Sequence, residues 1–72
     1  DPRIRRIAAV GVKGRVVLVV ETEAGEELKE DLQRRLAAAG QEVDEVRLTR
    51  KPLPVDPRHN SKIDYQRLRA RL

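Results

Sequence analysis

The residues of this chain whose types and spacing could do chemistry are concentrated between Leu53 and Leu72, in the run LPVDPRHNSKIDYQRLRARL. The prolines near its start predict a rigid loop, and loops held by a rigid scaffold often carry functional side chains. The candidate site consists of five polar loop residues and one lysine that precedes the last predicted helix: Asp56, Arg58, His59, Asn60, Ser61 and Lys62. The Lys62 ammonium would serve as a point charge for a phosphate or carboxylate, and a helix N-terminus beside it would strengthen that site.

The same segment is also typical of a plain helix-capping linker, because serine caps and proline loops are common. Ser61 is predicted to be the N-cap of the last helix, with Asp64 three residues later near the position of a capping box. On that helix Tyr65, Leu68 and Leu72 are predicted to share one apolar face.

Composition excludes several other kinds of site. Among the 72 residues there is no Cys, Met, Trp or Phe, and there is one His and one Tyr. The chain therefore has no thiol nucleophile, no disulfide, no multi-histidine metal cluster and no aromatic platform for single-stranded nucleic acid. It has no Walker-type glycine loop and no dinucleotide fingerprint. Its length predicts one small domain with a modest core and no deep pocket of its own.

Charge is distributed unevenly along the chain. The net charge is +4, made up of +4 over residues 1–20, −6 over residues 21–45 and +6 over residues 46–72. The basic ends would suit nucleic acid or another polyanion, whereas the simpler interpretation is a solvated surface with internal charge balance. No apolar run approaches the roughly 18 residues of a membrane span, and no signal peptide is visible. The absence of cysteine fits a reducing compartment, and we predict a cytoplasmic location.

The elements that position the loop follow from hydrophobic periodicity. Apolar runs at 7–12 and 16–20 predict two strands joined by a tight turn at 13–14, followed by a polar turn at 21–25. Leucines every four residues predict a helix over 26–39 that ends at Gly40, and alternation over 45–50 predicts a third strand. The predicted fold class is α+β: a small two-layer domain with a short, mostly antiparallel sheet of about three strands packed by two helices, in the order β-β-α-β-loop-α.

Three stretches, in the right order, resemble the C-terminal lid domain of the adenylate-forming superfamily, the AMP-dependent acyl-CoA synthetases and ligases. Residues 1–12, DPRIRRIAAVGV, resemble the family segment hP-x-V-x-x-A-A-V-V-G-V, and residues 16–36 resemble the strand and helix that follow it. Residues 53–68 resemble the closing motif L-P-x-T-x-x-G-K-I-D-R-x-x-L. The longer form P-V-D-x-R-H-N-x-K-I at 54–63 is similar to the olefin-biosynthesis branch, the β-lactone synthetases, which act on β-hydroxy acids.

The resemblance implies that residues 1–72 are a single domain, the lid of a larger carboxylic acid ligase whose N-terminal adenylation domain and hinge lie outside this chain. Such an enzyme uses ATP and Mg²⁺, with CoA where the acceptor is a thiol, on a fatty, β-hydroxy or other carboxylic acid. The equivalent of Lys62 is catalytic: it contacts the α-phosphate and substrate oxygens during acyl-adenylate formation. The resemblance assigns no role to the other five loop residues. We expect this domain by itself to be inactive and to hold none of these cofactors.

Two other functions stay open at this point. One is a free-standing basic α+β module that binds nucleic acid, and the other is a protein-interaction module that uses a sheet edge or the leucine face. The scarcity of aromatic residues and the acidic central helix argue against the first.

Overall fold

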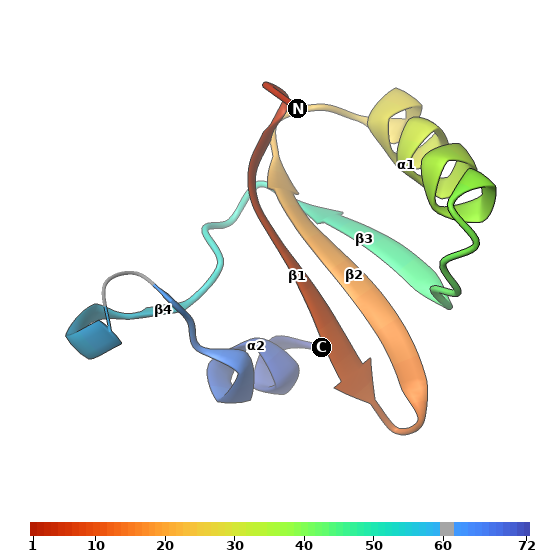
Figure 1. Cartoon of the computed structure of the whole chain (residues 1–72). Helices are drawn as coiled ribbons and strands as arrows, with labels where there is room; N and C mark the ends of the chain where they lie inside the picture. The colour runs from red at the N-terminus through yellow and green to blue at the C-terminus, as the bar shows by residue number, and fades with distance from the viewer. Residues whose placement is uncertain (60–61) are drawn as a thin grey trace.

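The computed structural model describes residues 1–59 and 62–72, which form a three-stranded sheet with one helix near each face (Figure 1). Strands β1 (Ile4–Val12) and β2 (Arg15–Thr22) form an antiparallel hairpin. Helix α1 (Glu26–Ala38) leads to β3 (Glu45–Thr49), which pairs with β2 in parallel. The chain then forms β4 (Val55–Asp56), a short 3-10 turn (Pro57–His59), β5 (Lys62–Ile63) and helix α2 (Tyr65–Arg71).

The β1–β2 hairpin closes through a two-residue turn at Lys13 and Gly14. Both residues have positive φ angles, 51° and 77°, as a type I′ turn requires. This turn matches the right-handed twist of the strands, and glycine adopts such angles at no steric cost. Lysine does so less readily, so Lys13 is held in a conformation that is uncommon for its type.

Helix α1 covers β2 and β3 and builds the first of two apolar clusters. The buried side chains of this cluster are Val20, Leu28, Leu32 and Val46, as the four-residue leucine spacing predicts. Acidic residues occupy the first turn of α1, where the helix dipole favours negative charge. The helix ends before Gly40, whose φ of 71° is typical of the residue that terminates a helix.

The opposite face of the sheet carries the second apolar cluster. Its buried side chains come from β1, β2, the proline loop and α2: Ala8, Val10, Val17, Val19, Leu53 and Leu68. In β2, odd-numbered Val17 and Val19 belong to this cluster and even-numbered Val20 to the first, because side chains alternate across a strand. Leu53, which follows β3 in the chain, therefore packs into the core beside the β1–β2 hairpin.

The predicted small α+β domain, with about three sheet strands and two helices, is confirmed. One refinement concerns strand direction in the three-stranded sheet, where β1 and β2 are antiparallel and β3 is parallel to β2. Helix α1 connects β2 to β3 and carries the chain back to the end of the sheet at which β2 began. The two strands therefore run in the same direction. A correction concerns Glu21 and Thr22. They were predicted to lie in a polar turn, but they are the last two residues of β2 and are buried.

Candidate functional site

The loop that carries the candidate site is anchored on the sheet before it projects into solvent (Figure 1). Leu53 is only 2% exposed, and its backbone N–H donates to the Glu21 Oε1 atom at 2.9 Å. Glu21 also lies 3.7 Å from an Arg6 guanidinium nitrogen. At the loop's first proline, the carbonyl of Pro52 accepts a 2.8 Å bond from Arg71 of α2. The loop is therefore tied to β2 by a buried carboxylate and to α2 by a guanidinium.

A small antiparallel ladder shapes the rest of the loop. Val55 pairs with Ile63 and Asp56 with Lys62, and the Asp64 N–H donates to the Pro54 carbonyl at 2.9 Å. Ile63 packs against the second apolar cluster. Since successive side chains of a strand point to opposite faces, the neighbouring Lys62 is directed away from that cluster and is exposed. The packing of the partly buried Ile63 on the cluster thus decides which way the lysine faces.

Lys62 shares a shallow hollow of about 330 Å³ with Asp56, Arg58 and the start of α2. The Arg58 N–H donates to Asp56 Oδ1 at 2.9 Å, and the Arg58 Nε lies 3.5 Å from the same oxygen. The Lys62 ammonium, by contrast, has no ion-pair or hydrogen-bond partner within residues 1–59 and 62–72. The arrangement presents an ammonium group in solvent on an anchored hairpin, with the charge of its guanidinium neighbour already paired.

The last helix begins later than the sequence predicted. Its N-cap is Asp64, whose Oδ1 atom accepts a 3.1 Å bond from the Arg67 N–H. The prediction of a helix beginning after Ser61 is therefore wrong, because Lys62 and Ile63 form β5. Their backbones pair with β4, and Asp64 caps the helix as well as a serine would. Lys62 consequently lies on a strand, two residues ahead of the helix N-cap, and not in the first turn of the helix.

The structure brings some of the predicted site residues together. Asp56, Arg58 and Lys62 line one hollow. Asn60 and Ser61 lie outside the described residues, and so does the side chain of His59, so their predicted places in the site stay predictions. The predicted apolar face of α2 is correct for Leu68, which is 1% exposed, but Tyr65 is 43% exposed.

Glu21 is the residue of this region that sequence reasoning missed. A glutamate that directly follows a continuous apolar run is the signal that could have found it, because such a run is typical of a buried strand and the strand can continue past its last apolar residue. Its burial leaves the carboxylate needing partners, and the loop backbone supplies one.

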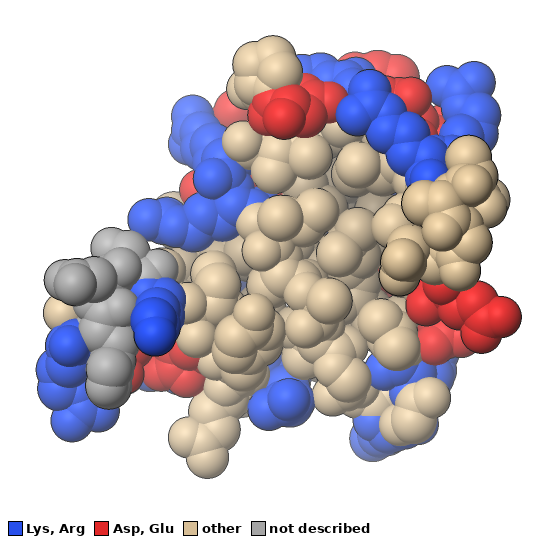
Figure 2. Space-filling model, viewed as in Figure 1, with Lys and Arg blue, Asp and Glu red and all other residues tan. Residues whose placement is uncertain are grey.

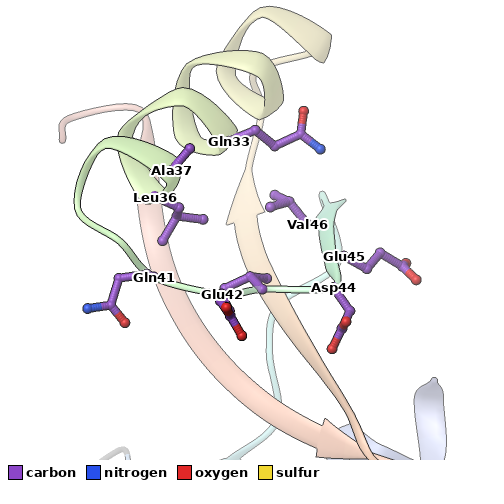
Figure 3. Close-up of a pocket in the computed structure, with 9 residues that line it drawn as sticks. Gln33, Leu36, Ala37, Gln41, Glu42, Asp44, Glu45 and Val46 are labelled. Atoms are coloured by element: carbon purple, nitrogen blue, oxygen red, sulfur yellow. The ribbon is translucent and has the colours of Figure 1, made fainter.

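A second hollow, of about 470 Å³, lies between the end of α1 and β3 (Figure 3). Leu36 and Val46 lie near its centre, while the polar side chains of Gln41 and Glu45 diverge from it in opposite directions. No cation, thiol or hydroxyl lines this hollow. Within the part of the chain that the structure describes, no group of three or more His, Cys, Asp or Glu side chains is placed to hold a metal ion.

Comparison with known proteins adds no identification. No protein-family model, no curated protein and no solved structure matches the chain. Among the described residues, no helix is long and apolar enough to cross a membrane.

Proposed function

We propose that this chain is the C-terminal lid domain of an AMP-forming carboxylic acid ligase, and that it supplies Lys62 to acyl-adenylate formation. The observation that carries the proposal is the placement of Lys62: exposed, without an ion-pair partner among the described residues, and held on a hairpin that Leu53 and Ile63 anchor to the core. The resemblance of residues 53–68 to the family's closing motif supplies the identity of the reaction.

The chemistry asked of Lys62 is electrostatic. Adenylate formation joins a carboxylate oxygen to the α-phosphorus of ATP and expels pyrophosphate, so negative charge is concentrated on phosphoryl and acyl oxygens. An ammonium aimed at those oxygens stabilises them more strongly when a closing domain excludes water. A single lysine on a small mobile domain would arrive only when the domain closes over the adenylation site.

The cofactors fit this chain only in part. Lys62 suits the α-phosphate of ATP as a point charge. Mg²⁺ and the remaining phosphates would be held by the N-terminal adenylation domain, since the described residues include no metal-binding group and the sequence has no glycine-rich phosphate loop. CoA, the acid and its fatty or β-hydroxy chain would likewise bind outside or across this domain. The chain by itself should release no pyrophosphate from ATP.

The basic ends of the chain support a lid better than a nucleic-acid module. Three guanidiniums of the C-terminal third lie within ion-pair distance of carboxylates, Arg47 of Glu45, Arg50 of Glu23 and Arg67 of Asp64. Figure 2 shows one face on which basic and acidic side chains are interspersed around an uncharged centre, with no continuous basic stripe. Phosphate-backbone binding relies on such a stripe.

The decisive experiment uses the intact enzyme that contains this domain. Lys62→Ala should lower ATP–pyrophosphate exchange by about 10²–10³-fold, the usual cost of one transition-state donor. Transfer from supplied acyl-adenylate should fall far less, because that step no longer needs the cation. Lys51→Ala, an exposed lysine at the start of the same loop, is the matched control and should leave both steps unchanged. An equal loss in both steps for Lys62→Ala would refute the assignment.

A further inference from the structure

A third hollow, of about 320 Å³, lies on the α2 side of the sheet and shares no residue with the Lys62 hollow. Its floor is apolar and its rim is basic: it is lined by Val12, Val17 and Leu72, by Lys13, Arg15, Arg47 and Arg69, and by Glu45. Four cationic side chains thus surround one carboxylate. The volume lies at the small end of the range for small-molecule pockets, which begins at about 300 Å³.

Strand alternation and register explain why these residues meet. Arg15 and Val17 share the face of β2 that bears the second apolar cluster. Glu45 is opposite Val17 in the β2–β3 ladder, and Arg47 follows on the same face. The hairpin turn contributes Lys13 and the last turn of α2 contributes Arg69, so four separate elements converge.

The charges around the hollow do not cancel. Glu45 accepts a 2.7 Å hydrogen bond from Arg47 and lies 3.7 Å from Arg15, and the bond from Arg47 is the main reason that the pKa of Glu45 is lowered. The carboxylate therefore stays ionised and neutralises one of its two arginines.

Three of the four positive charges are therefore left over, and two of them, on Lys13 and Arg69, lie outside the ion pairs of Glu45. Arg69 is fixed by a 3.1 Å bond from its Nε to the Gly11 carbonyl, which leaves its terminal nitrogens without a partner among the described residues. Lys13 has no partner there either, and it is held at the rim by its left-handed turn. Residues in sparsely populated backbone conformations recur at functional positions, and Lys13 is one such residue.

We propose that this hollow is a binding site for a small organic phosphate, with the phosphate held by Lys13 and Arg69 and the organic group resting on Val12, Val17 and Leu72. Guanidinium and ammonium groups are the side chains that bind phosphate best, and a charged rim over an apolar floor selects a ligand with both parts. The site does not depend on Lys62 or on the ligase assignment.

The test is a ¹H–¹⁵N NMR titration of the chain with phenyl phosphate and, separately, with inorganic phosphate. Binding should be saturable, with shift changes centred on the amides of Lys13, Gly14 and Arg69 and on the Arg69 Nε–H. Phenyl phosphate should bind several-fold more tightly than inorganic phosphate because only it covers the apolar floor. Equal affinities, or shifts spread over all basic surfaces without saturation, would overturn the proposal.

Variants separate this site from general attraction to a basic protein. Lys13→Gln combined with Arg69→Gln should weaken phenyl phosphate binding by roughly tenfold or more, since the pair of changes removes two positive charges at contact distance from the phosphate. Arg34→Gln combined with Lys51→Gln changes the net charge equally and should have no effect. If the loss of Arg69's bond to Gly11 impairs folding, Lys13→Gln alone provides the test. Equal weakening in the site variants and the control would refute a specific site.

Discussion

The buried carboxylate of Glu21 should be a principal support of the loop that carries the candidate site, and Glu21→Ala tests this. The side chain is 4% exposed and accepts the 2.9 Å bond from the Leu53 N–H. Truncation removes a charge-assisted hydrogen bond and leaves a buried N–H without an acceptor, which together cost about 2–3 kcal/mol. The lost Arg6 contact adds little, because that guanidinium is 40% exposed and regains water.

For a domain of this size, 2–3 kcal/mol corresponds to a fall in Tm of roughly 10–20 °C. We would measure it by urea unfolding followed by circular dichroism, supported by thermal melts. Glu21→Gln should cost less than about 1 kcal/mol, because the amide oxygen still accepts the Leu53 bond. The matched control is Glu23→Ala, whose side chain is 61% exposed and has contacts of 3.9 Å to Arg5 and Arg50. That change should cost less than about 0.5 kcal/mol.

Two outcomes would refute the reasoning. If Glu21→Ala were no more destabilising than Glu23→Ala, the bond to the loop would contribute nothing to stability. If Glu21→Gln were as damaging as Glu21→Ala, the negative charge would matter and the acceptor geometry would not. Hydrogen exchange of the Leu53 amide gives a direct readout: it should accelerate in the alanine variant beyond the change in global stability and stay slow in the glutamine variant.

Further predictions concern the core, the hairpin turn and acid stability. Leu68→Ala should destabilise the domain by about 2–5 kcal/mol because Leu68 is fully enclosed, whereas the exposed Tyr65→Ala should cost less than about 1 kcal/mol in the same unfolding assay. Lys13→Asn should stabilise the hairpin by about 0.5–1 kcal/mol, since asparagine tolerates the type I′ turn better; a lower midpoint in urea would contradict this. The hydrogen bond from Arg3 is the main cause that lowers the pKa of Asp31, so its stabilising effect is complete at neutral pH and is lost as the pH falls below about 4. In Arg3→Gln the Asp31 pKa measured by NMR should rise toward its ordinary value, and an unchanged pKa would show that this bond does not form in solution.

The ion pairs of α1 show which contacts helical spacing predicts and which it does not. The spacing of Asp31 and Arg35 predicts an i,i+4 pair, and the two side chains lie 3.1 Å apart. Arg34 has the same spacing from Glu30 but lies 3.8 Å from Asp31 instead. Asp31 also binds Arg3, the residue just before β1, at 2.8 Å. A residue 28 positions away in the chain thus makes Asp31 a centre of positive neighbours, which no helical periodicity could indicate.

Periodicity by itself determined the elements of the main sheet and of α1. Leucines every four residues are sufficient for α1, because a helix without a buried stripe would have little reason to persist. Gly14 and Gly40 mark the hairpin turn and the end of α1, because each adopts a positive φ that glycine tolerates best. The apolar runs predicted both hairpin strands, although the strands extend beyond those runs into charged residues at their outer ends.

Only the tertiary structure decided where the candidate loop lies and which way Lys62 faces. The parallel β3 delivers the chain to the end of β2, where the Glu21 carboxylate accepts the Leu53 N–H. Ile63 then pairs with Val55 and packs on the second apolar cluster, which turns Lys62 into solvent and delays α2 until Asp64. Local propensity favoured a helix that begins after Ser61. The pairing of β5 with β4 and the packing of Ile63 on the second apolar cluster prevent this, and neither contact can be predicted from the residues next to Ser61 alone. The sequence by itself thus indicates Lys62 as the candidate residue, and contacts between separate parts of the fold decide which way its side chain points.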